Sequence, residues 1–237
     1  MRAAPAGVTI NIGIEPPIYE VIPMKPFYLF TALALLAATG AASAVAPGVI
    51  RLARAGKGAA PAGWEMKVKE GSPVTYFEQD GEMPAFCMKG TRSSFSIQRR
   101  VDVDLKRFPV LSWRWKVKEL PKGGDFRVGS KDDQAAQLFV AFPGRESINY
   151  IWDTSAPVGA TGHYNLPLVI TVKTVVVASG AADRDRWVTV SRNVYEDYRR
   201  LFGKEPPNAE GLRFQINSQH TGSVAEGCLE SVEFREN

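Results

Sequence analysis

The sequence lacks every short motif that identifies a common catalytic or cofactor-binding site. It has no Gly-x-Ser-x-Gly elbow, no His-Glu-x-x-His, no Cys-x-x-Cys, no phosphate-binding loop and no dinucleotide-binding glycine pattern. Only two of its 237 residues are histidine, so a multi-histidine metal site cannot be built. These absences disfavour most enzyme classes, but they leave open hydrolysis or lysis by paired carboxylates.

Concentrated basic charge is also missing. The formal net charge is +4, and Lys and Arg are dispersed apart from short pairs such as Arg99-Arg100. A nucleic-acid-binding surface normally clusters its basic residues. We therefore expect no nucleic-acid partner.

Cysteine is scarce, with Cys87 and Cys228 the two present. In a reducing compartment both would be buried thiols. In an oxidising compartment they would form a disulfide if their Cα atoms lie within about 7 Å of each other. The sequence leaves both alternatives open.

The first long apolar run has the pattern of a secretory signal peptide. Lys25 precedes an uncharged stretch from Phe27 to Ala38, and small residues follow up to Ala42 and Ala44. Signal peptidase requires small side chains at the first and third positions before the cut. We predict a signal peptide over residues 24–44, cleavage after Ala44, and a periplasmic or secreted protein.

Residues 1–23 carry no targeting pattern, and we interpret them as an upstream start codon assigned in error. An alternative for the leader is an uncleaved membrane anchor, because the low-charge run from Pro26 to Ile50 is long enough to span a bilayer. The membrane would then be a partner through this segment alone.

The remaining chain divides into a predicted flexible leader, the Ala/Gly-rich residues 45–60, and one domain over residues 61–237. The domain consists of short segments in which apolar and polar residues alternate, for example Leu212, Phe214 and Ile216 on one face. Period-two segments separated by turn residues are typical of β-strands. We predict an all-β fold, a two-sheet antiparallel β-sandwich or jelly roll with eight to eleven strands.

One short helix is predicted near residues 194–202. Asn193 followed by Glu196 resembles a capping box, the acidic residues fall in the first turn and the basic ones in the last. Gly203 is a typical helix stop.

Several segments together resemble the bacterial domain-of-unknown-function family 3047. They are Trp113-Arg-Trp-Lys-Val, Asp132-Asp133 before an apolar strand, Tyr150-Ile-Trp152, and Arg192-Asn-Val-Tyr-Glu-Asp-Tyr-Arg with Phe202-Gly203. The resemblance covers roughly residues 62–236. It implies an exported sandwich similar to galactose-binding-like carbohydrate-binding modules, with no established activity. Where an acidic pair is expected before the last strands, this chain has Asn217-Ser-Gln-His220-Thr221.

The acidic pair Asp132-Asp133 stands where a loop enters a strand, and we predict that it binds a structural calcium ion. The alternative is a turn cap and an ion pair with Arg127 or Lys131.

The aromatic residues offer either a sugar platform or core packing. We assign Trp113 and Trp115 to the core, because alternating tryptophans on one strand usually face inward. Trp152 precedes a turn that starts at Asp153, so we predict that this pair lies at the rim of a binding site.

Two further polar pairs complete the predicted binding residues. Arg192 and Asp197 lie beside the predicted helix start, where capping and an ion pair are the alternative roles. Asn217 and His220 lie in a polar turn between strands, and loop residues of a sandwich often carry its function.

Three functions remain. The first is a non-enzymatic module that binds a glycan or another envelope polymer, favoured by the export signal and by the absence of catalytic motifs. The second is a glycan hydrolase or lyase that uses Asp132, Asp133 and Asp197. The third is an assembly partner of an envelope complex, recognised through an exposed apolar patch.

Overall fold

The computed structural model describes four ranges of the chain, which are residues 48–53, 60–79, 83–166 and 170–237. The predicted upstream segment and signal peptide lie outside the described residues, as does most of the predicted leader. Within the described part, none of the helices has the length and apolar character that crossing a bilayer would require.

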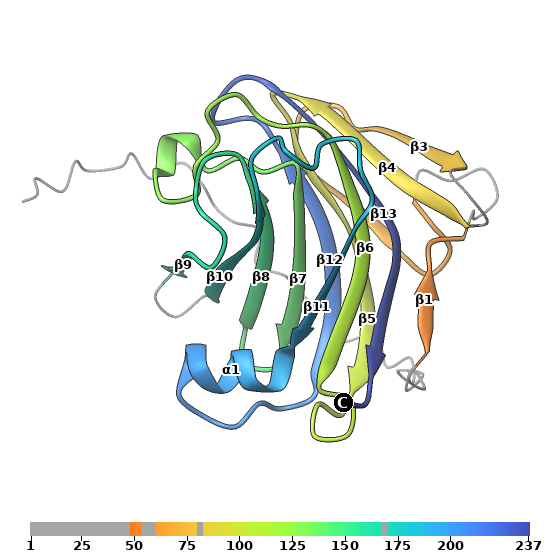
Figure 1. Cartoon of the computed structure of the whole chain (residues 1–237), viewed down its shortest axis with the longest axis vertical. Coiled ribbons are helices and arrows are strands. Elements are labelled where there is room, and N and C mark those ends of the chain that lie inside the picture. Colours follow the sequence, from red (N-terminus) through yellow and green to blue (C-terminus); the bar gives the residue numbers. More distant parts are fainter. Residues whose placement is uncertain (1–47, 54–59, 80–82, 167–169) are drawn as a thin grey trace, which may run out of the picture. The chain divides into compact units, whose positions relative to one another are not determined.

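The described residues form two β-sheets that pack face to face (Figure 1). The six-stranded sheet has the order β11-β6-β13-β4-β3, with β1 paired to β13 as well. Its strands are β1 (Val49–Arg51), β3 (Val74–Gln79), β4 (Pro84–Thr91), β6 (Val110–Glu119), β11 (Val188–Asn193) and β13 (Val224–Arg235).

The seven-stranded sheet has the order β2-β5-β12-β7-β8-β10-β9. Its strands are β2 (Glu65–Glu70), β5 (Ser94–Val103), β7 (Ala136–Phe142), β8 (Glu146–Asp153), β9 (Thr161–Leu166), β10 (Ile170–Ser179) and β12 (Ala209–Asn217). The predicted two-sheet β-sandwich is confirmed, with more strands than the eight to eleven expected.

The core lies between the sheets and holds the aromatic residues that the sequence assigned to it. Trp113 and Trp115 on β6 are both buried, and their rings meet edge to face. Across the core, Trp113 contacts Tyr150 and Trp115 contacts Trp152, both on β8. Aromatic contacts between the sheets therefore fix β6 against β8.

The short helix is also confirmed. Helix α1 (Val194–Phe202) begins where the Asn193 side chain accepts a hydrogen bond from the Glu196 amide. It ends at Gly203, whose backbone is left-handed and donates to the Arg199 carbonyl. The short 3₁₀ helix η1 (Gly129–Lys131) precedes β7.

The predicted flexible leader is wrong over Val49–Arg51. This segment forms β1 and pairs antiparallel with residues 231–233 of β13. Strand β13 is longer than its neighbour β4, so its last residues leave an edge that a short β-branched segment can pair with. Ile50 and Leu52 are buried as a result.

The sandwich is not wholly antiparallel, because β10 runs parallel to β8. After β8 the chain forms the edge strand β9. It then returns as β10, which lies between β8 and β9 and is antiparallel to β9.

The open question about the cysteines is resolved in favour of the disulfide. Cys87 on β4 lies directly opposite Cys228 on β13, and the two sulfurs are bonded.

Candidate functional site

The strands of the seven-stranded sheet have one face in the core and one face turned away from it. On β7, the alternate residues Ala136, Leu138 and Val140 belong to the core, so Gln137 and Phe139 between them point outward. The same alternation turns Asn149 outward on β8 and Arg213 outward on β12. We call this the outer face.

Strand register places outward residues of six neighbouring strands in one line, which we call the outer row. The pairs that define it are Glu65 with Gln98, Gln98 with Arg213, Arg213 with Phe139, Phe139 with Asn149, and Asn149 with Thr174. Directly paired residues have Cβ atoms about 5 Å apart. The outer row therefore brings a guanidinium, an aromatic ring and an amide together.

Three side-chain amides form a hydrogen-bonded chain across the outer face, which we call the amide chain. The Asn217 side chain is fixed by backbone groups, because its Oδ1 accepts from the Gln134 amide at 2.9 Å and its Nδ2 donates to the Asp132 carbonyl at 2.7 Å. Gln137 donates to Asn217 Oδ1 at 2.6 Å. Asn149 then donates to Gln137 Oε1 at 3.1 Å.

The backbone contacts of Asn217 determine the orientation of every amide in this chain. Gln137 must turn its NH₂ group to Asn217, so its oxygen faces Asn149, which must in turn present its own NH₂ group. Asn149 Oδ1 is left as a buried acceptor with no partner among the described residues, although Asn149 is only 6% exposed. A buried acceptor without a donor is costly in free energy, so this oxygen is a candidate contact for a ligand donor, which would have to displace the side chains that cover it.

A wall of loop residues borders the outer face beyond the amide chain. Ile151 on β8 and Val176 on β10 point outward and are covered by Ala156 and Phe126, from the loops after β8 and β6. Phe126 also lies against Gly162 on β9, where a Cβ atom would meet its ring at 2.6 Å. These loops thus cover one end of the face and leave the outer row beside them.

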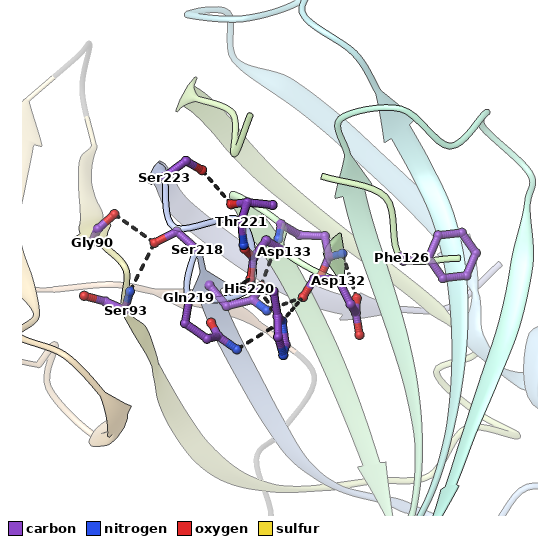
Figure 2. A network of polar contacts seen from close by, with 12 residues as sticks. Gly90, Ser93, Phe126, Asp132, Asp133, Ser218, Gln219, His220, Thr221 and Ser223 are labelled. Atoms are coloured by element: carbon purple, nitrogen blue, oxygen red, sulfur yellow. Dashed lines mark hydrogen bonds and ion pairs between the residues drawn. The ribbon is translucent and has the colours of Figure 1, made fainter. Parts of the chain in front are cut away.

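The polar turn predicted from the sequence connects β12 and β13 and lies at this same end. Figure 2 shows Asp133 directed at the backbone of the turn, with His220 beside it. Asp133 accepts hydrogen bonds from the amides of His220 and Thr221, at 3.3 and 2.6 Å. The carbonyl of Asp132 accepts from Asn217 and lies 3.0 Å from His220 Nδ1, so the turn and the amide chain share one network.

The tautomer of His220 follows from its neighbours. Its Nδ1 faces two acceptors, the Asp132 carbonyl and the Asp133 carboxylate, so Nδ1 carries a proton and Nε2 is the atom that titrates. The hydrogen bond with Asp133 raises the pKa of His220. Burial alone would raise the pKa of Asp133, but donors from His220 and Thr221 outweigh it and the pKa is lowered.

We expect His220→Gln to destabilise the protein more at about pH 6 than at about pH 9. The folded-state pKa is raised, so the stabilisation is complete below the unfolded value of 6.5 and is lost as the pH rises through the folded value. Urea unfolding of both proteins at each pH measures the difference. When Asp133→Asn is present in both proteins, the effect of His220→Gln on the free energy of unfolding should no longer depend on pH. If the difference in the free energy of unfolding between wild type and His220→Gln were equal at both pH values, this assignment would be contradicted.

The calcium site predicted at Asp132-Asp133 remains a prediction. Both Asp133 oxygens accept backbone N–H groups, and Asp132 Oδ1 accepts from Gln134 at 2.9 Å. Among the described residues, one group places three ligand-type atoms close together. It consists of Glu78, Cys87 and Cys228, and both of its sulfurs belong to the disulfide.

The predicted rim position of Trp152 and Asp153 is wrong. Trp152 is 1% exposed, because its side chain alternates with outward residues and enters the core with Tyr150. Its Nε1 donates to the Gly180 carbonyl. Asp153 is fully buried, and its carboxylate accepts from the amides of the two flanking loops at Phe126, Ser155 and Ala156.

Arg192 and Asp197 lie at the other end of the sandwich, beside α1 (Figure 1). Asp197 accepts two hydrogen bonds from Arg192, one from Arg200 and one from the buried hydroxyl of Tyr150. Tyr198 of α1 and Lys204, just after the helix, contact Glu146 at the start of β8, whereas Asp153 ends that strand. The structure gives this pair the ion-pair role and does not bring it to Asn217 and His220.

Sequence reasoning missed Gln137, Phe139, Asn149 and Arg213. Each alternates along its strand with apolar residues that face the core. For β12 this alternation of apolar and polar residues could be seen in the sequence. The sequence did not show that β12, β7 and β8 are adjacent in the sheet, and this adjacency brings the four residues together.

Solved structures of similar fold include sugar-binding modules and glycosidases. The xyloglucanase domain of NopAA from Sinorhizobium fredii, in complex with cellobiose, is 10% identical with a TM-score of 0.48, covering 81% of this chain and 98% of that one. A family 11 carbohydrate-binding module from Clostridium thermocellum is 11% identical with a TM-score of 0.42, covering 82% and 97%. Endoglucanase 3 of Trichoderma harzianum is 10% identical with a TM-score of 0.39, covering 75% and 100%.

Among the curated proteins, none has a sequence that matches this chain. A family match does exist, and it spans residues 62–233, which is most of the described sandwich. The chain belongs to the family described as "Protein of unknown function (DUF3047)".

Proposed function

We propose that this chain is a non-catalytic domain that binds a glycan on the outer face of its seven-stranded sheet, outside the cytoplasm. The observation that carries the proposal is the unpartnered Asn149 Oδ1 at the end of the amide chain, next to the Phe139 ring. A sugar can interact with both groups, because one of its hydroxyls can donate a hydrogen bond to the oxygen and its apolar ring face can pack on the aromatic side chain.

The amide chain also makes the site rigid before a ligand arrives. Asn217 is held by two backbone contacts, and each following amide is held by the one before it. The Asn149 oxygen is therefore already oriented before a ligand arrives, and this fixed orientation lowers the entropic cost of binding, although neighbouring side chains must move to expose the oxygen. Fixed polar groups of this kind are typical of sites that orient a small polar ligand.

The proposed location outside the cytoplasm has two supports. The leader over residues 24–44 has the pattern of a secretory signal, and the Cys87–Cys228 disulfide belongs to an oxidising compartment. An intact-mass measurement on exported protein, with Val45 as the first residue, is the check.

The glycan hydrolase or lyase alternative loses one of its proposed carboxylates. Asp197 lies in α1 and is bound by two arginines, whereas Asp132 and Asp133 precede β7 and lie near the other end of β8. A catalytic pair flanks one bond, about 5–10 Å apart. Asp132 and Asp133 remain as a pair, but Asp133 is buried and occupied by backbone donors.

Asn149→Ala and Phe139→Ala are expected to weaken glycan binding by about three- to tenfold each. A hydrogen bond is lost in the first variant and an aromatic contact in the second. A polysaccharide panel that includes xyloglucan, mixed-linkage glucan and several polyuronates identifies a ligand, and titration calorimetry with that ligand measures Kd.

Asn208→Ala is the matched control, because Asn208 is an exposed asparagine before β12 that bonds Asp102 and belongs neither to the outer row nor to the amide chain. It should leave Kd unchanged. Incubation of each bound polymer with the protein should release no new ends. If folded wild-type protein bound none of the panel, or if both outer-face variants bound like wild type, the proposal would fail.

A further inference from the structure

Two arginines point outward on the seven-stranded sheet without an acidic partner. Arg213 lies in the outer row between Gln98 and Phe139, and Arg100 lies on β5 opposite Gly211. Within the described residues, neither guanidinium has a carboxylate within ion-pair distance. Both groups lie on the same face as Asn149.

Arg213 is the more unusual of the two, because it is half-buried. Burial lowers the pKa of Arg213, and no neighbouring charge opposes this effect. Its guanidinium stacks over the Phe139 ring, 5.5 Å from the ring centroid. An aromatic ring compensates part of the desolvation cost, but a buried cation normally has an anion as well.

Several other partly buried cations have such anions, whereas Arg99 and Lys173 have none within ion-pair distance among the described residues. On the six-stranded sheet, Lys116 contacts Glu78 and Arg114 contacts Glu230, each at 2.5 Å. Beside α1, Arg192 contacts Asp197 at 2.5 Å. Arg213 also lacks an anion among the described residues, and its place on the outer face leaves it available to an anion from a ligand.

The acidic residue of the outer row does not fill this role. Glu65 stands at the edge on β2, two pairings away from Arg213, where it contacts Lys67 and Gln98. On the other side of Arg213 the outer row continues with Phe139 and Asn149. Arg213 is therefore the charged side chain of the outer row nearest to the free acceptor.

We propose that the glycan bound on the outer face is acidic, with its carboxylate on Arg213 and a hydroxyl on Asn149. This inference rests on the proposed glycan-binding function. Arg213 and Asn149 are two strands apart, about 10 Å, which matches the span of one to two sugar rings. The planar guanidinium bonds a carboxylate in a fork, and Arg100 adds positive charge beside it.

The test compares polygalacturonate and alginate with the same polymers after reduction of their carboxyl groups to alcohols. Wild-type protein should bind each acidic polymer at least tenfold more tightly than its reduced form. The preference should shrink as salt is added, because screening acts on the ionic contact alone.

Arg213→Gln should abolish this preference, and Arg213→Lys should restore part of it, since lysine keeps the charge but not the fork. Arg235→Gln removes one charge from an exposed arginine at the end of β13 and should leave the preference intact. Thermal unfolding of each variant verifies folding. If Arg213→Gln does not fold, the exposed Arg100→Gln should still reduce the preference.

The outcomes separate the two claims. Equal binding of acidic and reduced polymers, weakened by Asn149→Ala, overturns the acidic ligand and leaves the glycan-binding site in place. Binding by neither form, nor by any neutral polymer, overturns the glycan-binding site itself. An acidic preference that survives in folded variants of both Arg213 and Arg100 also overturns the assignment.

Discussion

Reduction of the Cys87–Cys228 disulfide is expected to lower the free energy of unfolding by about 5 kcal/mol. The bond joins residues separated by 141 positions, so it closes a long loop in the unfolded chain. In the chain-entropy model, most of the stabilisation is the conformational entropy that the unfolded chain loses through this closure. A loss of this size is comparable to much of the stability of a typical domain.

The surroundings of the disulfide add a kinetic expectation. Both cysteines are fully buried, with Tyr76 and Trp187 packed over them. A thiol reagent reaches the sulfurs after local opening, so reduction should be slow in native buffer and fast in urea near the unfolding midpoint.

Urea unfolding with and without reductant measures the effect, with free thiols counted to verify complete reduction. The double variant Cys87→Ala, Cys228→Ala is the control. It should unfold at the midpoint of the reduced wild type and should not respond to reductant. An unchanged midpoint in fully reduced wild-type protein would refute the expectation.

Asp197→Asn is expected to lower the free energy of unfolding by about 3 kcal/mol at neutral pH. The Asp197 side chain is 5% exposed and accepts hydrogen bonds from Arg192, Arg200 and Tyr150. Burial would raise the pKa of Asp197, but the hydrogen bonds and charge of Arg192 outweigh it, so the pKa is lowered. The variant leaves the Arg192 charge without its anion and removes an acceptor from a buried tyrosine hydroxyl.

The acid side of the stability profile provides a second readout. Because the folded pKa of Asp197 is lowered, its stabilisation is present above the unfolded value of 3.8 and is lost as the pH falls through the folded value. The gap between wild type and Asp197→Asn should therefore narrow below about pH 4. Asp183→Asn, at an exposed position, is the matched control and should cost little at any pH. A constant gap from neutral to strongly acidic pH would argue against the charged role.

The contacts of Asp197 and those of Asn217 explain why the polar residues selected from the sequence have different roles. Asp197 and Arg192 are five residues apart and meet through the start of α1, so a local contact accounts for them. Asn217 and Asp132 are far apart in the chain and meet because β12 pairs with β7. The sequence alone offers no means to distinguish a polar residue that pairs locally from one that joins a site.

Trp152 shows the same limit in the opposite direction. A large aromatic residue before a turn fits either a rim or the end of a core strand. The register of β8 decides which face of the sheet the Trp152 side chain occupies, and Ile148, Tyr150 and Trp152 share the inner face. Asn149, between two of these residues, is turned outward by the same register.

Local features could be predicted from the sequence: the period-two strands, the helix with its Asn193 cap and Gly203 stop, the inward positions of Trp113 and Trp115, and the family pattern. Each depends on residues within a few positions of one another, where side-chain period and capping act directly. The folded structure was needed to establish which strands are neighbours, that β10 runs parallel to β8, and that β1 pairs with β13. It also aligned Arg213, Phe139 and Asn149, because pairing between distant strands is set by the packing of the whole core.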